Sequence, residues 1–264
     1  MDLRIFETLD DLPVNMRAEA LAFQKDFRVA FDRFYWFAPE ILKSLHAASA
    51  NQSGLEHCRI CTDERAIKAD RAALYRGANR KRKPTKEQRQ EYLSALKRIY
   101  GRLPVQPPKP RKGDGILFVG IEREGRMLGE SLKWLTTEDD HCACIHVKRI
   151  RVDDGILVGM RRPKLERAFN RVEIIDGAIA SGATTMAVID ELKCKEIRIY
   201  SVHAAAEGAR ALSKFARDRN VDLQLSVGYV TEGLNESYYA KIYSKKLVVG
   251  DLGDMIAPLF APAQ

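Results

Sequence analysis

The chain has 264 residues, of which 45% are hydrophobic, and a formal net charge of +8. This length and apolar content suit one large domain, or a main domain with an appendage, built around a sizeable core. The sequence has no apolar run long enough to span a membrane, which takes about 18 residues. It also begins without the basic-then-apolar pattern of a secretion signal, and its five cysteines are an odd number. We therefore expect a cytoplasmic protein with reduced thiols and no membrane partner. Its positive charge permits nucleic acid or acidic small molecules as partners.

Residues 1–103 have the pattern of an all-helical region. In residues 14–46 apolar side chains recur at spacings of three and four, as on one face of a helix, and Pro39 would end or bend that helix. The aromatic members of this stripe are expected in the core or in a dimer contact. Further helical patterns occupy residues 62–74 and the segment after Thr85, which forms a capping box with the glutamine three residues later.

The same region also carries much of the positive charge. Residues 1–103 contain 20 Lys/Arg and 14 Asp/Glu, and four basic residues are adjacent at 80–83. Residues 104–115 contain four prolines and two glycines, a composition typical of a linker. This composition predicts an N-terminal helical extension at 1–103, a linker at 104–115 and a second domain at 116–264.

From residue 116 onward, short apolar runs alternate with helical patterns. The runs are 116–119, 144–150, 172–175, 197–202, 223–230 and 247–249, and the helical patterns are 127–135, 183–192 and 207–219. Such alternation is typical of an α/β fold with a mostly parallel sheet flanked by helices. In open sheets of this kind, ligands bind beyond the carboxyl ends of the strands.

The most informative segment is Asp-Gly-Ala-Ile-Ala-Ser-Gly-Ala-Thr-Thr, at residues 176–185. A strand at 172–175 is predicted to end at Asp176, and a helix is predicted to begin near Ala183. The turn between them leaves room for backbone amides to converge on a phosphate at the helix N-terminus, where the helix dipole also favours an anion. Its small and hydroxyl residues are Ala180, Ser181, Gly182, Ala183, Thr184 and Thr185. Asp176 would face a sugar hydroxyl or a cation. An ordinary strand-to-helix turn with an N-capping hydroxyl fits the same residues.

This string resembles the phosphoribosyl-pyrophosphate (PRPP) motif of type I phosphoribosyltransferases. Its single acid is most similar to the uracil phosphoribosyltransferase branch. The resemblance implies a type I phosphoribosyltransferase-like sheet, with PRPP bound by Asp176 and by residues 180–185.

A second loop, Gly-Ile-Glu-Arg-Glu-Gly at residues 120–125, is similar to the pyrophosphate-binding loop of the same family. The resemblance assigns PRPP binding to Gly120, Arg123 and Gly125. Arg123 supplies a planar cation suited to two phosphate oxygens. Two glutamates in the loop depart from the family pattern, and a solvated turn is the alternative interpretation.

A third string, Gly-Asp-Leu-Gly-Asp at residues 250–254, resembles the segment that closes the uracil site in the family. It implies base binding by Val249, Gly250, Asp251 and Gly253, with Asp251 holding magnesium through water. The family's Tyr-Ile-Val-Pro-Gly-Leu stretch is replaced here by Lys-Lys-Leu-Val-Val at 245–249. This departure leaves the identity of the base open.

Residues 151–171 occupy the place of the family's mobile flap, which closes over PRPP. From residue 148 to residue 171 the chain has eight basic and three acidic residues. Lys148 and Arg149 are therefore candidates for contacts with pyrophosphate. A solvated charged loop is the alternative.

The cysteines allow a second kind of site. Cys58 and Cys61 form a Cys-x-x-Cys, and Cys142 and Cys144 alternate along a later apolar run. Together, four thiolates could hold a structural zinc. Inward-facing core positions explain Cys142 and Cys144 equally well. His203 is interpreted as structural.

The resemblance implies an enzyme that transfers the 5-phosphoribosyl group of PRPP to a nitrogen of a heterocycle, uracil or a related base, giving a nucleotide monophosphate and pyrophosphate. Asp176, Arg123 and Asp251 are the predicted catalytic residues, and Mg²⁺ is the predicted cofactor. The resemblance also implies a homodimer. The alternative is a regulator or effector that senses nucleotides and binds nucleic acid through residues 1–103. A specialised enzyme of biosynthesis or phage defence is a third interpretation.

Overall fold

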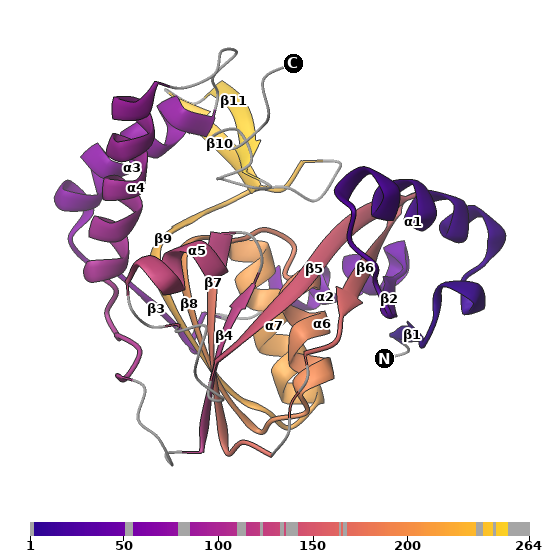
Figure 1. The fold of residues 1–264 in the computed structure, drawn as a ribbon. Coiled ribbons are helices and arrows are strands. Elements are labelled where there is room, and N and C mark those ends of the chain that lie inside the picture. The colour runs from indigo at the N-terminus through magenta and orange to yellow at the C-terminus, as the bar shows by residue number, and fades with distance from the viewer. Residues whose placement is uncertain are drawn as a thin grey trace.

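The computed structural model shows a twisted sheet with helices on both faces (Figure 1). It describes residues 3–50, 55–78, 85–109, 115–121, 124–132, 135, 142–163, 165, 168–235, 240–244 and 247–252. None of the helices in these ranges is long and apolar enough to cross a membrane.

The main sheet has nine strands, and five of its eight neighbouring pairs are parallel. The strands are β1 (Arg4–Phe6), β2 (Arg33–Phe37), β3 (Cys58–Ile60), β4 (Ile116–Ile121), β5 (Cys142–Val152), β6 (Gly155–Arg161), β7 (Arg171–Ile179), β8 (Glu196–Ala205) and β9 (Asp222–Thr231). Their order is β1-β2-β6-β5-β4-β7-β8-β9-β3. The prediction of a mostly parallel α/β sheet is confirmed. A separate hairpin consists of β10 (Ala240–Ser244) and β11 (Leu247–Leu252).

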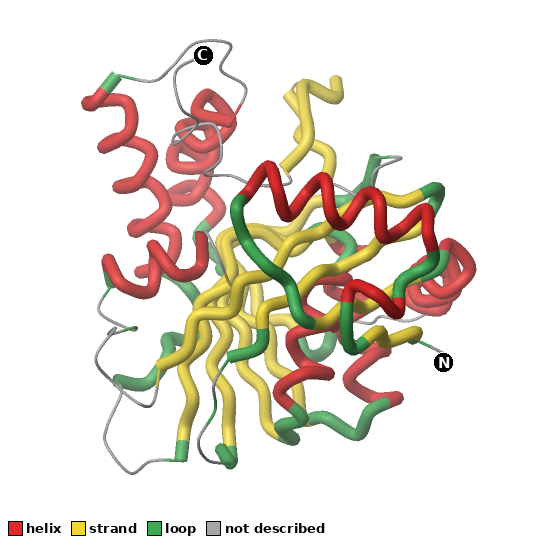
Figure 2. The backbone as a smooth tube through the Cα atoms, turned by 45° about the vertical axis from the view of Figure 1, so that its right-hand side comes forward, coloured by secondary structure: helices red, strands yellow, loops and turns green. Residues whose placement is uncertain are grey.

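Helices cover both faces of the sheet (Figure 2). They are α1 (Val14–Phe27), α2 (Pro39–Ala50), α3 (Glu64–Ala78), α4 (Lys86–Gly101), α5 (Glu124–Ser131), α6 (Ala183–Leu192) and α7 (Ala206–Asp218), with a short 3-10 helix at Leu9–Asp11. Side chains of a strand alternate between faces, so Val119 packs in the core under α2, α6 and α7, whereas Phe118 packs in the core under α3, α4 and α5. Helix α1 covers β2, β5 and β6 on the same side as α4 and α5.

The prediction of an all-helical region at 1–103 is wrong, because β1, β2 and β3 belong to the main sheet. The long predicted helix at 14–46 is divided in two. Helix α1 ends where Arg28 adopts a left-handed conformation with φ 52°. The aromatic run that follows favours a strand, and it pairs antiparallel with β6 from Arg33 opposite Met160 to Phe37 opposite Ile156.

The aromatic residues of β2 lie in the chain's own core. Phe34, Tyr35 and Phe37 have no exposed surface, so they provide no dimer contact. The capping box of α4 is confirmed, since Thr85 Oγ1 accepts a hydrogen bond from Gln88 N at 3.3 Å and Gln88 Oε1 accepts one from Thr85 N at 3.0 Å.

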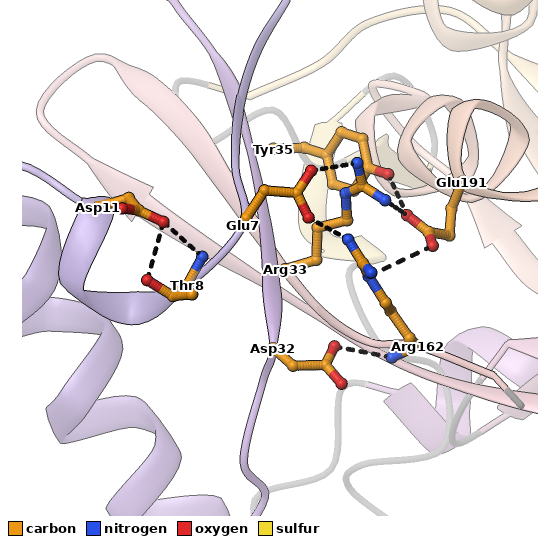
Figure 3. A network of polar contacts seen from close by, with 8 residues as sticks. All are labelled: Glu7, Thr8, Asp11, Asp32, Arg33, Tyr35, Arg162 and Glu191. Carbon is orange, nitrogen blue, oxygen red and sulfur yellow. Dashed lines mark hydrogen bonds and ion pairs between the residues drawn. The ribbon is translucent and has the colours of Figure 1, made fainter.

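A polar network ties the N-terminal strands to α6 (Figure 3). Glu191, in the last turn of α6, accepts hydrogen bonds from Arg33 at 2.8 Å and from the Tyr35 hydroxyl at 2.6 Å. Glu7 pairs with Arg33 at 2.6 Å and also contacts Arg162. Burial and the bond to Glu191 raise the pKa of Tyr35. Residues 4–37 are therefore integral to the fold.

Candidate functional site

Two of the predicted loops meet at the carboxyl ends of β4 and β7. These strands are parallel neighbours, with Gly120 opposite Ile175. Gly125, in the first turn of α5, lies directly on the backbone of β7. A Cβ atom at Gly125 would be 1.9 Å from the carbonyl oxygen of Ile175 and 3.4 Å from the Cα of Asp176. Only glycine permits this approach, which brings the first turn of α5 and Asp176 together.

Strand β7 is longer than predicted. It runs through Asp176 to Ile179, because β8 continues beside it, with Asp176 opposite Ser201 and Ile179 opposite Ala204. Asp176 therefore belongs to the strand and is held by strand pairing. Three residues, 180–182, then lead into α6.

The turn before α6 supports the predicted helix start at Ala183. Gly182 is the N-cap, with φ +82°, and its carbonyl accepts the Met186 amide at 2.8 Å. Ser181 Oγ accepts the Ala183 amide at 3.3 Å and the residue is 2% exposed. Ser181 stabilises the turn from the residue before the N-cap, and the N-capping hydroxyl of the ordinary-turn interpretation is replaced by Gly182.

Residues around this helix N-terminus differ in exposure. Of the residues from 176 to 185, Asp176, Ala180 and Thr184 are half-buried, as is Ala178, whereas Thr185 is 1% exposed. The half-buried residues are the ones that an anion at the α6 N-terminus could reach.

Lys148 and Arg149 lie on β5, past the end of β4. The last register pair of the two strands is Ile121 with Ile145. Lys148 is three residues farther along, which places it roughly 10 Å beyond that level. Both basic residues are half-buried.

The prediction of a mobile flap is wrong for residues 151–161. These residues form the end of β5, a turn and β6, and β6 is paired on both sides, with β5 and β2. Ile156, Leu157, Val158 and Met160 have no exposed surface. Because the apolar side chains of β6 are buried, this segment is held in the sheet and does not form a mobile loop.

The third predicted loop, at residues 250–254, begins within a strand. Val249, Gly250 and Asp251 lie within β11, of which the structure describes the backbone. Strand β11 pairs with β10 outside the main sheet, with Gly250 opposite Ile242. In both views the hairpin stands above the carboxyl ends of the parallel strands (Figures 1 and 2). Gly253 and Arg123 lie outside the described residues.

The prediction of a zinc site formed by four cysteines is wrong. Cys58 lies on β3 and Cys142 and Cys144 lie on β5, and five strand-to-strand steps, roughly 24 Å, separate these strands. Within the described ranges, no three His, Cys, Asp or Glu residues are grouped to hold a metal ion. Cys61, which follows β3, shares the position of Cys58 at the far edge of the sheet.

Two titratable groups, His203 on β8 and Glu173 on β7, are buried in the core of the sheet. His203 has no exposed surface, its Nε2 lies 2.7 Å from Thr231 Oγ1, and burial, with the charge of Arg71, lowers its pKa to about 3. A neutral, enclosed imidazole agrees with the structural interpretation. Glu173 is also fully buried, and burial raises its pKa although the Tyr200 hydroxyl donates to it at 2.6 Å.

Sequence reasoning missed both Glu173 and a contact from α4. Glu173 had a signal, a carboxylate inside an apolar run. The contact from α4 is the Tyr100 hydroxyl, which donates to the backbone carbonyl of Asp176. The two residues are 76 positions apart, so no local pattern pointed to it.

No protein-family model and no curated protein sequence matches the chain. Among solved structures, the chain is similar to the AQ2163 protein from Aquifex aeolicus, with a TM-score of 0.47 and 18% identity over 73% of this chain and 94% of that one. It is similar to an adenine phosphoribosyl transferase from Trypanosoma brucei, with a TM-score of 0.33 and 16% identity over 55% of this chain and 66% of that one. For a purine phosphoribosyltransferase from Pyrococcus horikoshii the TM-score is 0.30 and the identity 17%, over 57% and 91% of the two chains.

Proposed function

We propose that this chain is a phosphoribosyltransferase that binds PRPP at the carboxyl ends of β4 and β7. It transfers the 5-phosphoribosyl group to a ring nitrogen of a heterocyclic base and releases pyrophosphate. The observation that carries the proposal is the contact of Gly125 with Ile175 and Asp176. This contact supports the proposal because it places one end of the first PRPP-like loop, Gly125, against Asp176 at the start of the second.

Each part of this site has a role in the proposed reaction. The N-terminus of α6 and residues 180–185 receive the 5′-phosphate, since helix amides and the helix dipole favour an anion. Asp176 binds the ribose hydroxyls. Arg123, Lys148 and Arg149 offset the charge of the departing pyrophosphate. As the bond from the anomeric carbon to pyrophosphate breaks, the bond to the base nitrogen forms, and the protein contributes positioning and charge stabilisation.

Magnesium fits the carboxylates available. Asp176 is partly exposed in the carboxyl-terminal half of β7, and the resemblance assigns a second carboxylate, Asp251, to the ion. Mg²⁺ bound to phosphates keeps mostly water and substrate oxygens and adds one or two carboxylates. When bound, the ion neutralises charge on the pyrophosphate.

Calorimetry with PRPP and Mg²⁺ tests the proposal. Asp176→Asn removes the negative charge with little change in shape, and we expect it to weaken binding by about 10-fold to 100-fold, as for a lost charged hydrogen bond. Asp218→Asn is the matched control, because Asp218 pairs with Lys214 on the surface of α7. Absence of binding by the unmodified protein would refute the proposal. The nucleic-acid alternative would then be tested by a salt-dependent gel shift.

The base and the assembly are finer parts of the proposal. We propose uracil or a related pyrimidine as the acceptor, on the resemblance alone. A screen of bases with labelled PRPP that shows turnover with purines only would reject it. We also propose a homodimer, which a monomeric mass in light scattering would contradict.

A further inference from the structure

Tyr100 of α4 reaches the strand that carries Asp176. Its side chain is fully buried, and its hydroxyl donates to the backbone carbonyl of Asp176. The carbonyl of Tyr200, on β8, lies farther away at 3.5 Å. A hydroxyl has one hydrogen to donate, so the shorter contact, to Asp176, is the principal bond.

The end of α4 that carries Tyr100 lies directly on the sheet. A Cβ atom at Gly228 of β9 would be 2.3 Å from Cγ2 of Ile99, so the absence of a side chain there lets α4 approach. The chain after α4 is bound to the same strand. Ser226 Oγ accepts the Val105 amide at 3.1 Å and donates to the Val105 carbonyl at 3.0 Å.

Helix α3 fixes α4 from the other side. Asp70 of α3 is 4% exposed and pairs with two arginines. Arg98 Nη2 lies 2.6 Å from its Oδ1, and Arg102 Nη1 lies 2.7 Å from its Oδ2. These arginines flank Tyr100 in sequence, so the ion pairs restrain the segment on both sides of the tyrosine.

We infer that Tyr100 is a positioning residue for Asp176, and that the α3–α4 pair supports the active site through this tyrosine and is not a separate extension. This inference rests on the proposed function. The carbonyl and the side chain of Asp176 share one Cα atom, so a bond that fixes the peptide plane also restricts the direction of the Cα–Cβ bond from which the carboxylate extends. A binding group must be held within about 0.5 Å of its productive position, and such restraint is supplied by buried hydrogen bonds behind it.

Two matched substitutions test the inference. Tyr100→Phe and Tyr35→Phe each remove one buried hydroxyl and keep the ring. Tyr35 donates to Glu191 at 2.6 Å, in the last turn of α6, at the opposite end of that helix from residues 180–182. We expect Tyr100→Phe to weaken binding of PRPP with Mg²⁺ by roughly threefold to tenfold, the range of one hydrogen bond. Tyr35→Phe is expected to leave the affinity within about twofold.

A double-mutant cycle distinguishes positioning from general loosening of the fold. If Tyr100 acts through the carboxylate of Asp176, Tyr100→Phe has no further effect on binding in the Asp176→Asn background. An equal loss in both backgrounds, or no loss in either, would overturn the inference.

Hydrogen exchange supplies a readout that does not depend on PRPP. The Gly177 amide belongs to the peptide group whose carbonyl is that of Asp176. We expect it to exchange at least about threefold faster in Tyr100→Phe than in Tyr35→Phe, as expected for loss of about one hydrogen bond. If the unmodified protein does not bind PRPP, the proposed function fails, whereas equal exchange in the two variants would reject the role of Tyr100 itself.

Discussion

The contact between α5 and β7 makes Gly125→Ala the most informative perturbation. The added Cβ would lie 1.9 Å from the Ile175 carbonyl oxygen. A carbon and a carbonyl oxygen normally stay at least about 3.3 Å apart, so α5 and β7 must separate by roughly 1.4 Å. The obstacle is backbone in a paired strand, which no rotamer change relieves. We expect this overpacking to cost about 1–3 kcal/mol in the free energy of unfolding.

The same displacement acts on the proposed site. It moves the 120–125 loop away from Asp176, and a misplacement of about 1 Å can reduce a rate about 100-fold. The assays are urea unfolding for stability, calorimetry for PRPP binding and turnover with the accepted base. The matched control is Gly101→Ala. Gly101 is the last residue of α4, and a Cβ there would meet no atom within 4 Å. Alanine at this position is expected to stabilise by up to about 1 kcal/mol, because it is favoured in helices.

Comparison of these two variants tests whether the packing of α5 on β7 assembles the proposed site. If Gly125→Ala matches Gly101→Ala in stability and in PRPP affinity, the close packing of α5 on β7 is not what assembles the site. If Gly125→Ala is destabilised but binds PRPP normally, the packing is real and the role assigned to the 120–125 loop is refuted.

Two further predictions concern stability. Because the pKa of His203 is lowered to about 3 in the folded chain, the unfolded chain takes up a proton below about pH 6.5 that the folded chain does not. The contribution of neutral His203 to the free energy of unfolding is therefore complete above pH 6.5 and is lost as the pH falls toward 3, by about 2 kcal/mol at pH 5. His203→Gln should lack this part of the acid sensitivity, which urea unfolding at pH 7 and pH 5 would measure. Equal pH dependence in both proteins would contradict it. Glu191→Gln removes the buried carboxylate from Arg33, whose side chain is 13% exposed and keeps its pair with Glu7, and we expect a loss of about 2 kcal/mol in the free energy of unfolding, the range of a charged hydrogen bond. Asp218→Asn, in a surface pair, should cost less than about 0.5 kcal/mol, and similar losses for both would argue against a stabilising network.

Local patterns were sufficient for the elements that depend on neighbouring residues. The start of α6 at Ala183 and the capping box of α4 at Thr85 both follow from residues within one helical turn. The apolar runs of β4, β7, β8 and β9 were recognised because strands buried on both faces are continuously hydrophobic. These features also predicted which loops lie at the carboxyl ends of the strands.

Strand pairing between distant segments was decided by the tertiary structure. The spacing of the aromatic residues of β2 continues that of α1 and predicts a helix, whereas the identity of β2 as a strand depends on β6, with Phe37 opposite Ile156. β7 extends beyond Asp176 because β8 continues beside it. Neither partner can be inferred from the strand's own residues, since β propensity depends on what a strand packs against.

The sequence by itself determined the chemistry available: a turn suited to phosphate, an aspartate before it, and glycines in the neighbouring loop. The tertiary structure decided which of these groups meet and what holds them. It excluded the zinc site, because five strand steps separate Cys58 from Cys142. It also placed the Tyr100 hydroxyl on the Asp176 carbonyl across 76 residues. Hydrogen bonds between distant segments leave no periodic signal in a sequence, because they depend on how whole elements pack.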